Sequence, residues 1–346
     1  MQIASSVYDG PTPLQRLTFN TYDSYLNIIE KQESGWFPCT PSSSGLCPIP
    51  STGPWLRQTY TIFSGDSNAS TACNATILAS KYIVNKPCQI VGTDGSNKAY
   101  SLVSYSYDNN GNLLNESKCV SVSGNGSSAS CSSSWQTQYS YDGTGQLLQK
   151  IEGYGTSAAA TTAYTWTGPT GQTDSYNGYL TKITHPDGTT DQYSYYYNSG
   201  QLATHSDANS QTTQYLYNDP GNLSRLTETK YPDRGDVQIS YNDATPPSVT
   251  VTTATGEVSG PIVRTTQYDG LGRTVQTQLN SDPYGTDYVD TTYDANGRVY
   301  TVSNPHRTTS STTDGTTYYL YDALNRPLTV TNPDNTKKRS GMLEIQ

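Results

Sequence analysis

Tyr105-Ser-Tyr107-Asp-Asn-Asn-Gly111-Asn-Leu113 is a phrase that recurs along this 346-residue chain. It returns as Tyr139-Ser-Tyr141-Asp-Gly-Thr-Gly145-Gln-Leu147, Tyr268-Asp-Gly-Leu-Gly272-Arg273, Tyr293-Asp-Ala-Asn-Gly297-Arg298 and Tyr321-Asp-Ala-Leu-Asn325-Arg326. Degenerate copies are Tyr197-Asn-Ser-Gly200, Tyr217-Asn-Asp-Pro-Gly221 and Tyr241-Asn-Asp. From Tyr197 to Tyr321, the tyrosines that mark successive copies lie 20, 24, 27, 25 and 28 residues apart. Self-similarity at this period predicts one supersecondary unit stacked many times.

One repeat reads as a β-hairpin. Tyr-x-Tyr places two rings on the same face of a strand, because side chains alternate with period two. The aspartate begins a turn, and the glycine three residues later supplies the positive φ that closes it. A second alternating stretch follows, so the unit is two strands joined by a four- or five-residue connection. Asn325 replaces the glycine in the last copy and tolerates the same left-handed backbone.

The tyrosines, turn aspartates, glycines and arginines of the repeat are expected to be structural positions. They are Tyr107, Asp108, Gly111, Tyr141, Asp142, Gly145, Tyr197, Gly200, Tyr217, Gly221, Tyr268, Asp269, Gly272, Arg273, Tyr293, Asp294, Gly297, Arg298, Tyr321, Asp322, Asn325 and Arg326. In the Tyr197 copy the glycine follows one residue sooner, which predicts a tighter turn or a bulge.

A second phrase supports the hairpin interpretation. His185-Pro-Asp-Gly188, Tyr231-Pro-Asp-Arg-Gly235 and Asn332-Pro-Asp-Asn335 each follow a β-rich stretch, and proline followed by aspartate suits a type I or II turn. Helix signals are nearly absent, and Tyr22-Asp23 favours strands even in the Leu- and Ile-containing stretch 13–33. The predicted fold is all-β.

Arg273, Arg298 and Arg326 follow the turn at the same repeat position. We expect each guanidinium to stack on a tyrosine ring or to pair with the turn aspartate of a neighbouring repeat. The alternative is that these arginines are solvated.

The phrases Tyr-x-Tyr-Asp-x-x-Gly and Pro-Asp-Gly resemble those of the RHS or YD-repeat family, which includes the shells of bacterial polymorphic toxins, the ABC-toxin cocoon and the teneurins. The resemblance is clear over 86–336 and faint over 1–85, at Tyr8-Asp9-Gly10 and Tyr22-Asp23. It implies tandem hairpins forming a curled, spiralling antiparallel sheet that is part of a shell. It adds no catalytic residue.

The resemblance also implies a function. The chain would be a non-catalytic shell segment of a secreted or cell-surface protein, enclosing or presenting a C-terminal toxin or effector that this chain does not contain. Its partners would be the rest of the array and that cargo domain, with no cofactor. The alternative is an adhesion or carbohydrate-binding module, because tyrosines such as the Tyr193, Tyr195, Tyr196 and Tyr197 cluster could stack on sugar rings.

Composition excludes several classes of protein. Net charge is −9 and only 14% of residues are charged, which argues against a nucleic-acid-binding surface. No apolar run approaches the length of a membrane span. Tyrosines outnumber phenylalanines 30 to 3, so tyrosine is expected to replace aliphatic packing. Histidines 185, 205 and 306 lie in or beside separate turns, where solvated side chains are expected, and no metal or catalytic site is predicted.

Six cysteines, Cys39, Cys47, Cys73, Cys88, Cys119 and Cys131, all lie in the first 131 residues. Six cysteines permit about 15 connectivities. We favour the sequential pairing Cys39–Cys47, Cys73–Cys88 and Cys119–Cys131, in which each bridge closes an irregular insertion. Disulfides would indicate an oxidising compartment, and buried free thiols are the alternative.

The chain divides into a degenerate, cysteine-containing β region (1–85), the repeat array (86–336) and an unstructured tail (337–346). No secretion signal is visible, and both ends are expected to be cut from a longer array, the alternative being a complete protein with worn terminal repeats.

Overall fold

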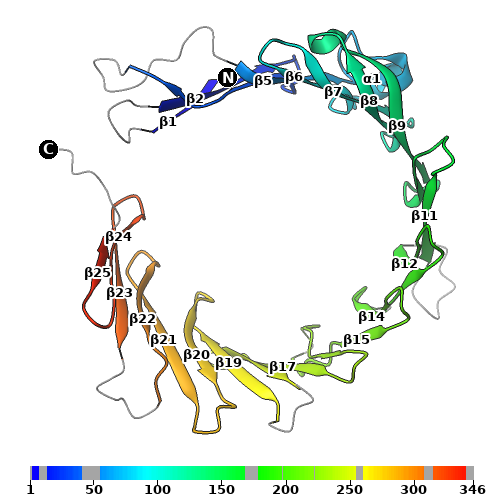
Figure 1. Cartoon of the computed structure of the whole chain (residues 1–346). Helices are drawn as coiled ribbons and strands as arrows, with labels where there is room; N and C mark the ends of the chain where they lie inside the picture. Colours follow the sequence, from blue (N-terminus) through cyan, green and yellow to red (C-terminus); the bar gives the residue numbers. More distant parts are fainter. Residues whose placement is uncertain are drawn as a thin grey trace. The chain divides into compact units, whose positions relative to one another are not determined.

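The computed structural model describes residues 2–7, 14–40, 55–167, 178–196, 198–221, 223–254, 260–307 and 315–339. These fall into two compact units, which are described separately below. Unit 1 comprises 1–166 and 182–189, and unit 2 comprises 167–181 and 190–346. Figure 1 shows that hairpins succeed one another in chain order within each unit.

Unit 1 is an antiparallel sheet in which nearly every strand pairs with the next along the chain. Its strands are β1 (Gln2–Val7), β2 (Leu14–Tyr22), β3 (Ile28–Ser34), β4 (Phe37–Pro38), β5 (Trp55–Phe63), β6 (Pro87–Asp94), β7 (Ala99–Tyr107), β8 (Leu113–Ser123), β9 (Ser130–Tyr141), β10 (Leu147–Glu152) and β11 (Ala160–Thr167). The short β4 pairs with β2 instead. Between β5 and β6 lie a 3-10 turn, η1 (Thr71–Cys73), and the helix α1 (Ala75–Ser80), which the sequence analysis did not predict, and η2 (Gly126–Ser128) precedes β9.

Unit 2 continues the same pattern. Strand β12 (Tyr179–Thr184) is divided between the units, and unit 2 then holds β13 (Thr190–Tyr195), β14 (Leu202–Ser206), β15 (Thr212–Leu216), β16 (Glu228–Lys230), β17 (Asp236–Asn242), β18 (Ser248–Thr253), β19 (Ile262–Tyr268), β20 (Thr274–Leu279), β21 (Asp287–Tyr293), β22 (Val299–Ser303), β23 (Thr316–Tyr321), β24 (Pro327–Thr331) and β25 (Lys337–Arg339). From β13 to β25 each strand pairs antiparallel with its successor. The prediction of an all-β chain of tandem hairpins in antiparallel sheet is confirmed.

The Tyr-Asp turns form as the sequence predicts. In the first copy, Oδ1 of Asp108 accepts hydrogen bonds from the backbone N–H groups of Asn110 and Asn112, both at 2.8 Å. Gly111 adopts a φ of +83° and its N–H donates to the carbonyl of Asp108. The register between the two strands shifts at Tyr107, so the turn carries a β-bulge. The same bonds recur at Asp142, Asp269, Asp294 and Asp322.

Glycine is needed at the closing position because L side chains rarely adopt the left-handed conformation. Asn325, which replaces it, has a φ of +63°, as predicted. The faint copy at Tyr22 also forms this turn, since Asp23 accepts from the N–H groups of Tyr25 and Asn27. Gly221 is an exception, because its φ is not positive.

The Pro-Asp phrases close the opposite ends of the hairpins. In each, the backbone N–H of the first residue donates to the carbonyl oxygen four positions later, at 2.8–2.9 Å; the donors are His185, Tyr231 and Asn332. These turns join β12 to β13, β16 to β17 and β24 to β25. A repeat therefore has a Tyr-Asp turn at one end and, in these three cases, a Pro-Asp turn at the other.

Fully buried apolar side chains occur only in unit 1 among the described residues. One cluster joins Cys73, Ala75, Leu78, Cys88 and Tyr107, which packs α1 against β6 and β7. A second contains Val91, Ala99, Leu102 and Ala129. In the described part of unit 2 the packing is supplied by half-buried tyrosines, threonines and valines, in line with the aromatic composition.

Two of the predicted disulfides form. Cys73 is bonded to Cys88 and Cys119 to Cys131, with Cα–Cα distances of 5.3 and 5.7 Å. The first attaches the segment containing α1 to β6, and the second joins β8 to β9. Cys39 is also disulfide-bonded. Its predicted partner, Cys47, lies outside the described residues.

The proposed division of the chain maps onto this fold as follows. Both sides of the 85/86 boundary lie in unit 1, where β5 pairs with β6 across it. The prediction of an unstructured tail is wrong for Lys337–Arg339, which form β25 because the Asn332 turn returns the chain along β24. Residues 340–346, and the faint copy at Tyr8, lie outside the described residues.

We predict that Cys73→Ala/Cys88→Ala lowers the free energy of unfolding by about 3 kcal/mol, because the bridge closes a loop whose ends are 15 residues apart. Urea unfolding under oxidising conditions measures the loss. The matched control is Cys119→Ala/Cys131→Ala, which opens a shorter, more exposed loop and should cost less. An unchanged urea midpoint in the first variant would contradict the prediction.

Candidate functional site

The feature that repeats most regularly in side-chain detail is a contact between one repeat and the next. Tyr293, at the end of β21, donates its hydroxyl hydrogen to the carbonyl oxygen of Thr274, at 2.7 Å. Thr274 begins β20, directly after the preceding Tyr-Asp turn. The guanidinium of Arg273, the last residue of that turn, lies 4.3 Å from the centre of the Tyr293 ring. The tyrosine is therefore held between a backbone carbonyl and a cation of the preceding repeat.

The hydroxyl contact recurs along the chain. Tyr107 donates to Pro87, Tyr195 to Leu180 and Tyr241 to Leu226, at 2.8–2.9 Å. In β11, Trp166 takes the place of the tyrosine, and its indole N–H donates to the carbonyl of Leu147 at 2.7 Å. Each acceptor is the first residue of a strand or lies within one or two residues of the first. We refer to this contact as the tyrosine anchor.

The residue preceding the acceptor covers the ring in most copies. Arg225 lies 4.1 Å from the centre of the Tyr241 ring, and Arg298 lies 4.8 Å from that of Tyr321. Nζ of Lys86 lies 5.9 Å from the centre of the Tyr107 ring. In the Tyr195 copy the covering group is the ring of Tyr179, whose centre lies 4.8 Å from that of Tyr195. The stacking part of the arginine hypothesis is thus confirmed for Arg273 and Arg298.

The described ion pairs of Arg273, Arg298 and Arg326 do not reach the carboxylate of a neighbouring turn. Each guanidinium pairs with the aspartate of its own turn: Nε of Arg273 to Asp269 at 2.7 Å, with the same bond in the other two at 2.7 and 2.6 Å. The four-residue spacing across a tight turn brings the two side chains together. The carboxylate therefore orients the arginine over the next tyrosine, and Arg298 also donates to the backbone carbonyl of Asp322 and the side chain of Asn325 in the next repeat.

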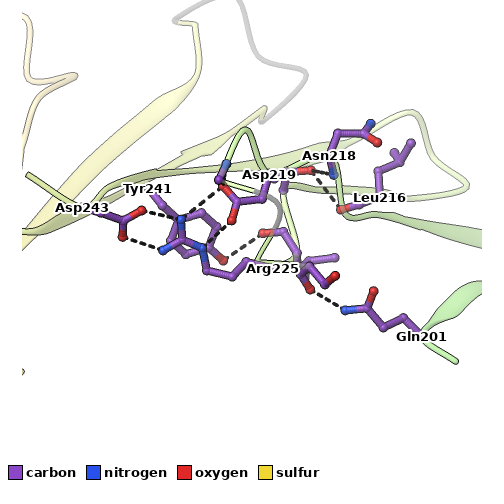
Figure 2. Close-up of polar contacts among 11 residues, drawn as sticks. Gln201, Leu216, Asn218, Asp219, Arg225, Tyr241 and Asp243 are labelled. Atoms are coloured by element: carbon purple, nitrogen blue, oxygen red, sulfur yellow. Dashed lines mark hydrogen bonds and ion pairs between the residues drawn. The ribbon is translucent and has the colours of Figure 1, made fainter. Parts of the chain in front are cut away.

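Arg225 was not singled out in the sequence, and it makes the most extensive set of contacts. Figure 2 shows its guanidinium between two carboxylates beside Tyr241. Its Nε donates to Oδ2 of Asp219 in its own loop at 2.7 Å. It also donates two hydrogen bonds, of 2.7 and 2.8 Å, to the carboxylate of Asp243 in the next repeat. Hydrogen bonds to Asp243 and Asp219 raise the pKa of Arg225 and lower the pKa of both carboxyl groups. Here the guanidinium does pair with a neighbouring repeat.

Burial favours the protonated form of two anchoring tyrosines, Tyr107 and Tyr195, by raising the pKa of each phenol. Desolvation raises the pKa of Tyr107 well above its usual value, and it raises the pKa of Tyr195 in the same direction. A phenol that stays neutral remains a hydrogen-bond donor over the whole physiological range of pH. The Tyr107 and Tyr195 hydroxyls therefore remain donors to Pro87 and Leu180 at neutral pH.

The remaining predicted positions occupy the expected places with one correction. The repeat tyrosines end their strands or directly follow them: Tyr141 for β9, Tyr217 for β15, Tyr268 for β19 and Tyr321 for β23. Positive φ angles are found at the turn glycines Gly145, Gly200, Gly272 and Gly297. Tyr197 lies outside the described residues. The anchoring residue in that copy is Tyr195, so the repeat begins two residues earlier than predicted.

The tyrosine cluster does not form one aromatic surface. Tyr193 stacks on His205 at 4.7 Å between ring centres, and Tyr195 packs on Tyr179. Tyr196 instead borders a cavity, 5.8 Å from Tyr217 in an edge-on arrangement. Tyr193 and Tyr195 are two residues apart in β13, and their rings are separated because one packs on His205 of β14 and the other on Tyr179 of β12.

Two of the histidines depart from the solvated-turn prediction. Nε2 of His205 lies 3.2 Å from Oδ1 of Asp191, and Nε2 of His306 lies 2.8 Å from Oδ2 of Asp290. Each histidine is on a strand or bridge adjacent to its aspartate. Among the described residues, no group of three or more histidine, cysteine or acidic side chains could hold a metal ion.

No known protein-family model matches the chain, and no curated protein matches its sequence. Solved structures that are similar include TcdB2-TccC3 crystallised without its hypervariable C-terminal region (12% identity, 94% of this chain and 19% of that chain, TM-score 0.45). Another is the Photorhabdus luminescens Tc holotoxin pore, at 13% identity and a TM-score of 0.41, with 95% of this chain and 19% of that chain covered. A porin-like protein from Bacteroides uniformis is also similar, at 11% identity and a TM-score of 0.20, with 69% of this chain and 88% of that chain covered.

This chain thus spans about a fifth of the length of the two Tc chains. Over the ranges described here, no helix is both long and apolar enough to cross a membrane. Membership of the RHS/YD-repeat family stays a prediction.

We predict that Arg298→Ala lowers the free energy of unfolding by about 1–2 kcal/mol, because it removes the stack on Tyr321 and the bond to the side chain of Asn325. Arg298→Lys should recover only part of the loss, since an ammonium cannot stack as a plane. Chemical denaturation measures both. Arg264→Ala, an exposed arginine on β19, is the control, and an equal loss there would refute the assignment.

Acid should weaken the turns. Hydrogen bonds from the N–H and then the guanidinium of Arg273 hold the pKa of Asp269 below its usual value. A carboxyl whose pKa is lower in the folded state contributes stability above its unfolded pKa of about 3.9, and this contribution is lost as pH falls through the folded value. The difference in urea midpoint between the wild type and Asp269→Asn should therefore narrow below about pH 4. A constant difference down to pH 2 would contradict it.

Proposed function

We propose that this chain is a non-catalytic segment of the wall of a secreted or cell-surface RHS/YD-repeat protein. The array, including 86–336, encloses or presents a C-terminal toxin or effector. The tyrosine anchor is the observation that supports this proposal. It joins a repeat to its predecessor in copies spread from Tyr107 to Tyr293, through residues that belong to the repeat itself.

A wall built of repeats requires a repeat that can be followed by further copies and that makes a stabilising contact with the copy before it. The pairing of each strand with its successor supplies the first requirement, and the anchor with its covering cation supplies the second. In such an array each unit contacts only the units beside it, so stability is passed along the chain. The rest of the same array is therefore the natural partner of this segment.

The side chains of the repeat support a structural role over an enzymatic one. Arg273 and Arg298 pair with turn aspartates and cover tyrosines, and the turn aspartates hold backbone N–H groups. These groups are occupied by contacts within the sheet. The cystines in unit 1 support an extracellular location, because disulfides persist in oxidising compartments.

Limited proteolysis of the protein expressed together with the downstream part of its gene tests the proposal. The downstream segment should resist proteinase K when the array is intact. Arg225→Ala/Arg273→Ala/Arg298→Ala, which removes three covering cations, should make it susceptible, whereas Arg264→Ala should not. Equal cleavage of the downstream segment with and without the array would overturn the proposal.

A further inference from the structure

We propose that the cavity between two adjacent loops of unit 2 binds a neutral saccharide of one or two rings. The cavity has a volume of about 510 Å³ and is lined by Tyr196, Asn198, Ser199, Gln201, Tyr217, Asn218 and Ser224. The loops are those that follow β13 and β15. The inference does not depend on the proposed wall function, since it concerns a site that the repeat contacts leave unused.

A hydrogen bond between described residues links the two loops. The side-chain amide of Gln201 donates to the carbonyl of Ser224 across the two loops (Figure 2). In the second loop, Arg225 forms ion pairs with Asp219 and Asp243. A site whose groups are held in place before the ligand arrives loses less entropy on binding.

Two tyrosine rings form the aromatic part of the lining. The hydroxyl of Tyr196 donates to the carbonyl of Tyr215 at 3.0 Å, which fixes the orientation of a ring that is 40% exposed. Its neighbour Tyr217 stands at 86° to it, so the two rings present differently oriented surfaces. The face of an aromatic ring carries partial negative charge and attracts the C–H groups on the flat side of a sugar.

The polar part of the lining consists of amides and hydroxyls. The side chains of Asn198 and Asn218 are exposed and make no hydrogen bond within the described part of the chain. An amide offers two N–H donors and a carbonyl acceptor, which is the combination that adjacent sugar hydroxyls require. Gln201 keeps its side-chain oxygen for a ligand while its nitrogen is occupied.

Charge selects the class of ligand. No lining residue is charged, whereas the other cavities described in this chain each include an acidic side chain. The nearest carboxylate of the loop, Asp219, is only 6% exposed and is paired with Arg225. A charged ligand would find no counter-ion here, and the volume lies within the ~300–1,000 Å³ of small-ligand sites. A neutral, hydroxyl-rich ring fits these conditions.

Saturation-transfer NMR with the full chain tests the proposal. The probes are lactose, cellobiose, maltose and chitobiose at millimolar concentration, with glucuronate and inorganic phosphate as charged comparisons. We expect transfer to at least one neutral disaccharide and weaker transfer to the charged probes. No transfer to any of the four, or stronger binding of the charged probes, would overturn the proposal.

Variants locate the binding. Asn198→Ala/Asn218→Ala should weaken the affinity by at least about tenfold, the loss expected for one or two hydrogen bonds. Both side chains are exposed, so this variant should fold, and circular dichroism checks that it does. The matched control, Asn209→Ala/Asn296→Ala, removes two exposed turn amides outside the cavity and should leave the affinity unchanged. Equal affinity in the two double variants would refute the assignment of the site.

Discussion

The hydrogen bond from a tyrosine hydroxyl to a carbonyl of the preceding repeat is the contact on which this architecture depends. A half-buried phenol must satisfy its hydroxyl, and the carbonyl of the strand that leaves the preceding turn is within reach. The two partners are separated by 15 residues in some repeats and by 19 or 20 in others. The intervening loop can therefore vary in length, which explains why the repeat has no strict period.

The turn aspartate serves two purposes at once. One oxygen of Asp294 accepts two backbone N–H bonds and shapes the turn, while the other accepts from Arg298. The arginine is thereby directed over the ring of Tyr321. Local turn chemistry and the link between repeats are thus connected through a single carboxylate.

Much of this fold could be predicted from the sequence, because its rules are local. Aspartate and glycine fix the turns within four residues, and tyrosines two apart must share a face. The missed features are those that depend on partners far along the chain. Four tyrosines within the five residues 193–197 leave the register ambiguous, and Arg225 stands six residues after Asp219 instead of four. Trp166 replaces tyrosine without changing the geometry, which a search for tyrosine overlooks.

The lack of fully buried apolar side chains in the described part of unit 2 has a thermodynamic consequence. The heat capacity of unfolding comes mainly from newly hydrated apolar surface, and exposed polar surface reduces it. A sheet fastened by phenols, threonines and ion pairs therefore has a shallow dependence of stability on temperature. Its enthalpy of unfolding changes little between cold and warm surroundings, so cooling should weaken it less than a protein with an aliphatic interior.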